Sequence, residues 1–296
     1  MAKSSLASSG VSLSPSRWRE LHPRVFFLET WRDLDREAES EKRNRGEGYD
    51  WRPLVVFALG GVCLTLMEYF GGGNTFERVL RAIDEAGAHS PLARQTIDAM
   101  RANPYRGLFQ YCWWSGWRVL GYFLIPAISI WCMGGRIRDY GLSTRGFLEH
   151  AWIYVFFYVI VLGCVVVVSF SPSFANYYPF YKQAQRSWSD LVLWELLYAA
   201  QFFSLEFFFR GYWLQACKRT MGSAAIFAMI VPYCMIHYGK PWLEAIAAIF
   251  AGVVLGTLAL RTRSIWSGFL IHVSVALSMD LAALMQTTGL PDRWLP

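Results

Sequence analysis

The chain has 296 residues, of which 54% are hydrophobic, 17% aromatic and only 17% charged. Soluble domains carry about 25% charged residues, so the composition excludes an ordinary soluble enzyme and a disordered protein. Six cysteines, 24 glycines and 12 prolines also exclude a disulfide scaffold and a collagen-like repeat. The net charge of +6 comes from bases scattered between apolar runs. We therefore predict no nucleic-acid partner and interpret the excess charge as a signal of membrane orientation.

Residues 1–50 are predicted to form a basic, cytoplasmic N-terminal segment. The segment contains no apolar stretch of the kind that a cleaved signal peptide requires. The basic side chains in and directly after this segment include Arg17, Arg19, Arg24, Arg32, Arg36, Lys42, Arg43, Arg45 and Arg52. Because such residues favour the cytoplasmic side of a membrane, we expect the start of the chain to remain there.

Apolar runs long enough to cross a bilayer follow, since a spanning helix needs about 20 mostly apolar residues. The runs predict an all-α, polytopic membrane helix bundle with about seven transmembrane helices. Their bounds are 53–71, 119–135, 151–181, 190–217, 224–238, 242–260 and 265–285. Lys and Arg are more frequent on the N-terminal side of this arrangement, which predicts a cytoplasmic N-terminus and a C-terminus on the opposite side. We expect a bacterial inner membrane, because no organelle-targeting segment is visible.

The sequence divides into two membrane parts after the N-terminal segment. Residues 51–189 are predicted to hold the first transmembrane helices, with a helical loop at 72–106 that lies along the membrane surface or projects from it. Residues 190–286 hold the remaining helices and most of the ionisable groups found in apolar runs. Such groups cost about 2.5–3.5 kcal/mol each on insertion, so they usually face a cavity or a partner and mark a functional site.

Glu206 and Arg210 lie four residues apart, so both project from the same face of a helix. A helix-end ion pair with Arg210 extended toward the surface is the simpler interpretation. The depths of Glu206, His237 and His272 along their membrane helices favour a functional pocket instead. Glu206 and His237 lie at similar distances on either side of Gly222, the predicted turn, and His272 reaches a matching depth from the turn at Arg263. The three groups are predicted to share one polar pocket.

These residues resemble the motifs of the CAAX protease and bacteriocin-processing family, which includes the type II CAAX prenyl endopeptidases. The family pattern is EExxxR, then FxxxH, then HxxxN or HxxxD, on successive membrane helices. Here the first motif reads Leu205, Glu206 and Arg210, followed by Gly211, the second reads Tyr233 and His237, and the third reads His272 and Ala276. Gly252 and Gly256 match the family's small-residue helix. The resemblance spans roughly residues 190–285.

Two positions depart from the family pattern. Leu205 stands where the family has its first glutamate, which is assigned to water activation, and Ala276 stands where an Asn or Asp assists the last histidine. Glu244 and Asp280 are candidate replacement carboxylates. The alternatives are an acid at a helix N-terminus for Glu244 and a polar residue in the outer half of the membrane for Asp280.

The resemblance implies an intramembrane endopeptidase that hydrolyses a peptide bond of a membrane-associated protein or peptide. Glu206 and His237 would act as general base on a water, Arg210 would hold Glu206, and His272 would donate to the oxyanion. No cofactor is expected, although Glu206, His237 and His272 are also the ligand types of a catalytic zinc. The alternative functions are a catalytically silent scaffold or immunity-type membrane protein and, third, a transporter. Neither the substrate nor the oligomeric state can be predicted from the sequence.

Overall fold

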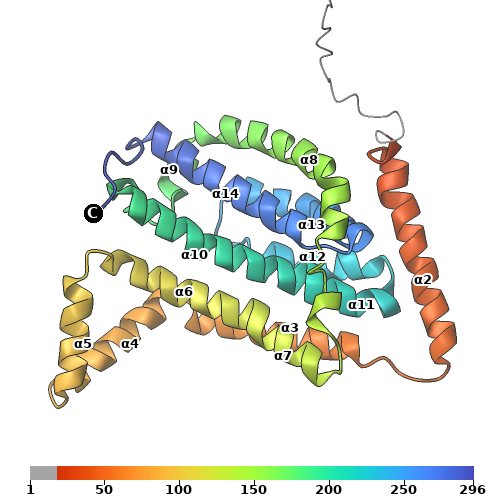
Figure 1. Cartoon of the computed structure of the whole chain (residues 1–296), viewed down its shortest axis with the longest axis horizontal. Coiled ribbons are helices and arrows are strands. Elements are labelled where there is room, and N and C mark those ends of the chain that lie inside the picture. The colour runs from red at the N-terminus through yellow and green to blue at the C-terminus, as the bar shows by residue number, and fades with distance from the viewer. Residues whose placement is uncertain (1–18) are drawn as a thin grey trace, which may run out of the picture.

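The computed structural model describes residues 19–296, without the side chains of residues 145 and 146. The chain folds into a bundle of helices, and no strand occurs among the described residues. This arrangement confirms the predicted all-α polytopic membrane bundle (Figure 1). The first 18 residues of the predicted N-terminal segment, including Arg17, lie outside the described residues.

Among residues 19–296, five helical segments are long and apolar enough to cross a membrane. They are α3 (Arg52–Phe70), the part of α8 (Arg145–Ser169) from Phe147 onward, the continuous segment Trp188–Met221, α13 (Trp242–Thr262) and α14 (Trp266–Gln286). Two other predicted spans correspond to less regular elements. One is the helical stretch α6 (Phe109–Val119), η3 (Leu120–Leu124) and α7 (Ile125–Cys132), and the other is α12 (Ala224–Met235), with only 12 residues.

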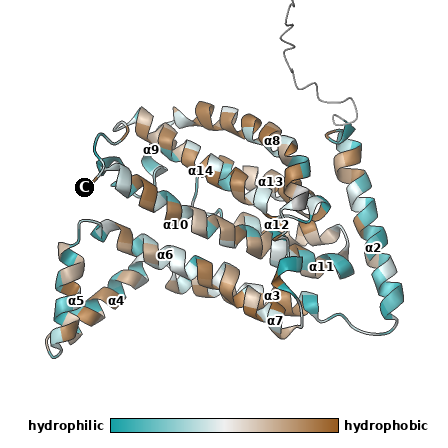
Figure 2. Cartoon of the chain, in the orientation of Figure 1, coloured by the Kyte–Doolittle hydropathy of each residue, from teal (hydrophilic) through white to brown (hydrophobic). Residues whose placement is uncertain are grey.

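The segment Trp188–Met221 forms the centre of the bundle. It consists of α10 (Trp188–Glu206), the π-helix η6 (Phe207–Trp213) and α11 (Leu214–Met221). Half of its most apolar window is buried, against 17% for α8, so α8 presents most of its apolar surface outward. Helix α14 packs between α10 and α8, α6 packs on α10, and α12 packs on α13 (Figure 1). Figure 2 shows brown, hydrophobic residues along much of these helices.

Local sequence signals explain several helix ends. Ser187 begins α10, where its hydroxyl accepts from the backbone N–H of Asp190 at 3.1 Å. Gly222 ends α11 with φ +55°, a conformation that glycine adopts without strain, and this confirms the predicted turn. Pro232 lies inside α12, which ends at Met235, two residues before His237.

The N-terminal helix α2 (Thr30–Arg45) crosses one end of the bundle, where α11 and α13 end (Figure 1). Its side chains bind this end directly. Asp35 Oδ1 accepts from the backbone N–H of Ser223 at 2.7 Å, and the indole of Trp31 donates to Thr257 at 3.0 Å. At the opposite end, α4 (Gly73–Ala86) and α5 (Pro91–Ala102) form a hairpin that projects away from the other helices (Figure 1).

Candidate functional site

The site forms where the end of α10 meets η6 in the most densely buried part of the molecule. Phe207, Phe208 and Phe209 are completely buried and surround this turn with aromatic rings. In a π-helix the backbone hydrogen bonds close over five residues instead of four, and such wide turns are frequent at functional sites. Gly211 lies in this turn because a Cβ would approach the carbonyl oxygen of Tyr140 to 2.6 Å.

Glu206 and Arg210 form an ion pair without any exposure to solvent. Arg210 Nη1 lies 3.2 Å from Glu206 Oε1, and both side chains are 0% exposed. The guanidinium also stacks on Tyr233 of α12, with its Cζ 4.0 Å from the ring centroid. Arg210 therefore does not extend to the membrane surface. It neutralises a carboxylate whose burial alone in the bundle would be costly.

His272 of α14 binds the same carboxylate. Its Nδ1 lies 2.9 Å from Glu206 Oε1 and 3.1 Å from the carbonyl oxygen of Gly268. Gly268 makes this approach possible, because a Cβ there would lie 2.1 Å from Glu206 Oε2. On its other side, His272 Nε2 lies 3.0 Å from the hydroxyl of Tyr233. The His272 ring stacks on Phe202 and keeps 17% of its side chain exposed, so the cluster reaches the surface at this residue.

His237 lies beside this cluster without touching Glu206. Its Nδ1 is 2.8 Å from the carbonyl oxygen of Tyr233, and its ring packs edge-on against the Tyr233 ring. A carbonyl oxygen only accepts, so Nδ1 carries the proton and Nε2 of the neutral ring holds a lone pair. Among the described side chains, none binds His237 Nε2. The sequence predicted that His237 acts together with Glu206, whereas in the structure His272 contacts the Glu206 carboxylate.

The two candidate replacement carboxylates lie elsewhere. Glu244 forms an ion pair with Lys240, and its Oε2 accepts from the hydroxyl of Tyr178 at 2.7 Å. Asp280 Oδ2 accepts from the indole of Trp194 at 2.7 Å, while Asp280 Oδ1 and Glu195 Oε1 are buried without a hydrogen-bond partner among the described residues. The two carboxyl groups interact with each other and form a separate acidic pair.

The remaining departures from the motif are apolar core positions. Leu205 is 5% exposed and packs in the aromatic core around η6, so no carboxylate replaces the first motif glutamate at that point. Ala276 is 4% exposed and packs in the cluster that contains Trp194 and Tyr198. The histidine that it would assist is instead bonded by Tyr233, which sequence reasoning treated only as a motif position.

The pairing of Glu195 with Asp280 was also missed, although helix geometry contains the signal. Glu195 precedes Glu206 by eleven residues on α10, and Asp280 follows His272 by eight on α14. At 1.5 Å per residue these spacings are about 16 Å and about 12 Å along helices that run in opposite directions. Glu195 and Asp280 are therefore displaced in the same direction along the bundle from the Glu206–His272 contact, to similar depths.

The donor set does not fit a zinc ion. Glu206 Oε1 already faces Nη1 of Arg210 and Nδ1 of His272, and a guanidinium at this distance repels a divalent cation. His237 has a free Nε2, but it does not touch Glu206 and so does not complete a ligand set with that carboxylate. Within residues 19–296, no group of three or more His, Cys, Asp or Glu side chains is placed to hold a metal.

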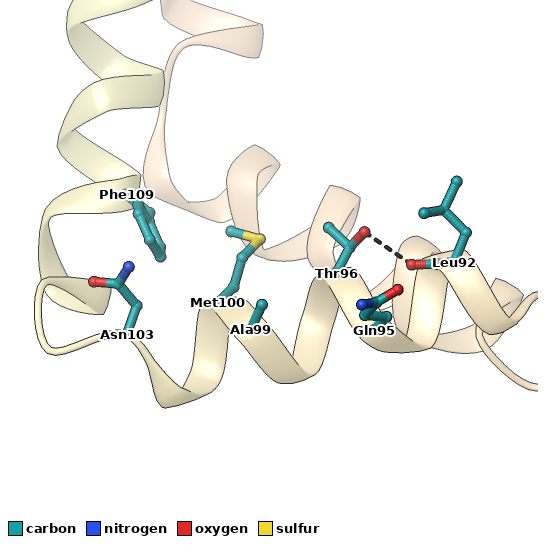
Figure 3. Close-up of a pocket in the computed structure, with 7 residues that line it drawn as sticks. All are labelled: Leu92, Gln95, Thr96, Ala99, Met100, Asn103 and Phe109. Carbon is teal, nitrogen blue, oxygen red and sulfur yellow. Dashed lines mark hydrogen bonds between the residues drawn. The ribbon is translucent and has the colours of Figure 1, made fainter.

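A surface groove between α5 and the start of α6 carries no comparable chemistry. Figure 3 shows its lining, in which the Thr96 hydroxyl donates to the carbonyl of Leu92 at 2.8 Å. None of its side chains titrates near neutral pH, and none belongs to the Glu206 cluster. The lining residues are Leu92, Gln95, Thr96, Ala99, Met100, Asn103 and Phe109.

Fold and site together define a polytopic integral membrane protein with a buried carboxylate, guanidinium and imidazole in contact. Residues 187–278 match the family model described as type II CAAX prenyl endopeptidase Rce1-like. The match covers α10, η6, α11, α12, α13 and the first part of α14, and it confirms the resemblance seen in the motifs. No curated protein and no solved structure matches the chain significantly.

Proposed function

We propose that this protein is an intramembrane endopeptidase that hydrolyses a peptide bond of a membrane-associated protein or peptide. The observation that carries the proposal is the contact of His272 and Arg210 with Glu206, inside the segment that matches an endopeptidase family. Acid–base hydrolysis needs a group that takes a proton from water and returns it to the leaving amine. An imidazole oriented by a carboxylate is such a group.

In this proposal Glu206 and His272 act as one acid–base unit. Glu206 holds the proton of His272 on Nδ1, so Nε2 is the basic atom of the unit and gains a proton as the attacking water loses one. The water oxygen adds to the carbonyl carbon, and the carbon–nitrogen bond then breaks as His272 returns the proton to the amine. Arg210 balances the charge of Glu206, and the free Nε2 of His237 accepts a hydrogen bond from the second hydrogen of the water, which stays on the oxygen.

This assignment differs from the roles that the resemblance implied. Glu206 has no exposed surface and is bound by two cationic or donor groups, so it supports a neighbouring base better than it activates water itself. His272 has one exposed edge and contacts the carboxylate directly. The base is therefore assigned to His272, and His237 becomes the residue that positions the water.

The name of the matched family suggests a substrate class, a protein whose C-terminus is prenylated on the cysteine of a Cys-a-a-X sequence. We use a farnesylated peptide of this type as the first probe. The protein is further proposed to reside in a bacterial inner membrane with its N-terminus in the cytoplasm. Support for that orientation comes from four basic residues at the bundle end that α2 crosses, which are Lys218, Arg219, Arg261 and Arg263.

A comparison of protein termini in host membranes tests the function before the substrate is identified. Membranes are prepared from cells that express the native chain, Glu206→Gln or His272→Gln at equal levels. Glu244→Gln is the matched control, because it changes a carboxylate outside the cluster. Uncleaved precursors are expected with the first two variants and not with the control.

The opposite outcome favours a silent scaffold. Removing the charge of Glu206 leaves Arg210 buried without its partner, at a cost of about 3–5 kcal/mol, so folding of that variant has to be verified. His272→Gln avoids this problem because its side chain is partly exposed. Unchanged termini in folded His272→Gln, with a deletion strain that is nonetheless impaired, would contradict the endopeptidase proposal.

A further inference from the structure

Both ring nitrogens of His272 are occupied by protein groups. Nδ1 faces two acceptors, Glu206 Oε1 at 2.9 Å and the Gly268 carbonyl at 3.1 Å, so this nitrogen carries the proton. Nε2 of the neutral ring then accepts, and the Tyr233 hydroxyl at 3.0 Å donates to it. A proton that enters or leaves His272 Nε2 therefore has to pass through the hydroxyl of Tyr233.

Tyr233 is held in place by its surroundings. The side chain is 1% exposed, the Arg210 guanidinium lies on one face, and Phe209 packs edge-on with its centroid 5.3 Å away. A cation on the face of the ring stabilises negative charge that develops on the phenol. Glu206, His272 and Tyr233 thus form a carboxylate, an imidazole and a hydroxyl in series, the order found in acyl-transfer triads.

We propose that Tyr233 is a catalytic residue that relays protons between the substrate and His272, and this proposal rests on the endopeptidase function above. When water attacks the carbonyl carbon, its proton moves to the Tyr233 oxygen while the Tyr233 proton moves to His272 Nε2. When the carbon–nitrogen bond breaks, Tyr233 gives its proton to the amine and regains one from His272. Water and amide become acid and amine, nothing is oxidised, and the cluster returns to its starting state.

Tyr233→Phe removes the hydroxyl and keeps the ring against Arg210. The full-length protein is assayed in lipid nanodiscs with an internally quenched, farnesylated peptide. Loss of the relay is expected to lower kcat by about 10²- to 10⁴-fold, the usual contribution of general acid–base catalysis, with KM unchanged. Tyr238→Phe is the matched control, because Tyr238 is 67% exposed and its hydroxyl has no described partner.

Two readouts distinguish a relay from a merely structural role. The pH profile of kcat is expected to change in Tyr233→Phe while the thermal midpoint of unfolding does not. Nitrogen NMR of labelled histidine is expected to show a shifted Nε2 resonance for His272 in this variant and not in the control. A Tyr233→Phe enzyme with native kcat overturns the relay and leaves the endopeptidase standing.

Failure of the proposed endopeptidase function would give different results from failure of the Tyr233 relay. If the native protein does not cleave the farnesylated peptide, the assay is repeated with a precursor identified by the comparison of termini. If that comparison shows no precursor for Glu206→Gln or His272→Gln, the endopeptidase function and the relay are overturned together.

Discussion

Gly268 determines whether the carboxylate of Glu206 and the ring of His272 can meet. Its carbonyl binds His272 Nδ1, and the space of its missing side chain is filled by Glu206. A Cβ at this position would lie 2.1 Å from Oε2, far inside contact distance. Because Glu206 is also bound to Arg210, the carboxylate cannot yield without disturbing its own ion pair.

Gly268→Ala is therefore expected to displace Glu206 from His272. A misplacement of about 1 Å in a catalytic group costs about 10²-fold in rate, so a loss of this order is predicted for kcat. The measurement is peptide cleavage in nanodiscs at equal amounts of folded protein. Gly163→Ala on α8 is the matched control, because its Cβ would meet no atom within 4 Å. Native kcat in Gly268→Ala would show that the Glu206–His272 contact is dispensable.

Sequence reasoning located the residues of the site better than their partners. The four-residue spacing of Glu206 and Arg210 predicted their ion pair, because helix geometry is regular over one turn. The partner of Glu206 was predicted less well. The depth estimate treated residues 222–237 as one continuous helix, whereas α12 contains Pro232 and ends at Met235. His237 therefore turns back onto the Tyr233 carbonyl, and His272 takes its place.

The helices that follow from local sequence were predicted, whereas the element that depends on tertiary packing was not. Apolar runs predicted α3, α8, α13 and α14, because hydrophobic length alone defines a spanning helix. The π-turn η6 could not be predicted from hydrophobic length or periodicity. It depends on how Phe207, Phe208 and Phe209 pack into the core, and no local pattern in the sequence encodes that packing.

Asp50 connects three elements at the end of the bundle that α2 crosses. Its carboxylate accepts from Arg52 of α3 at 2.8 Å and from Thr220 of α11 at 2.8 Å, and it pairs with Arg45 of α2 at 3.2 Å. Burial raises the pKa of Asp50, but the hydrogen bonds from Arg52 and Thr220 outweigh it and lower the pKa to about 2. The carboxylate therefore stabilises the folded chain as an anion.

The depressed pKa sets the pH range of this contribution. A group with a lower pKa in the folded state stabilises fully above its unfolded pKa of 3.8, and the effect is lost as the pH falls toward 2. Asp50→Asn is expected to reduce stability by about 2 kcal/mol, equally at pH 7 and pH 5, with the difference closing only below about pH 4. Thermal unfolding of both proteins in detergent checks this, and a difference that already vanishes at pH 5 would contradict it.

At the scale of the molecule, the two ends of the bundle differ in structure and charge. Helix α2 and the basic turns after α11 and α13 occupy one end, and the hairpin of α4 and α5 projects from the other (Figure 1). The predicted orientation would place this basic end in the cytoplasm. Figure 2 shows the same contrast, with hydrophilic colouring along α2 and apolar colouring along the bundle helices.

Cysteine labelling in intact cells tests the orientation. Single cysteines are introduced as Arg43→Cys in α2 and Gln95→Cys in α5, in a chain whose exposed Cys112, Cys132 and Cys164 are replaced by serine. A maleimide that cannot cross the inner membrane is expected to label position 95 before cell disruption and position 43 only afterwards. The reverse order would place the N-terminus outside the cytoplasm.

Hydrolysis by the Glu206–His272 unit is tested most directly by mass spectrometry of the farnesylated peptide incubated in heavy-oxygen water. The native protein in nanodiscs is predicted to release a fragment with heavy oxygen in its new carboxyl group, at a rate that Glu244→Gln retains and folded His272→Gln loses. Release at the native rate by His272→Gln, or fragments without heavy oxygen, would contradict hydrolysis by the Glu206–His272 unit.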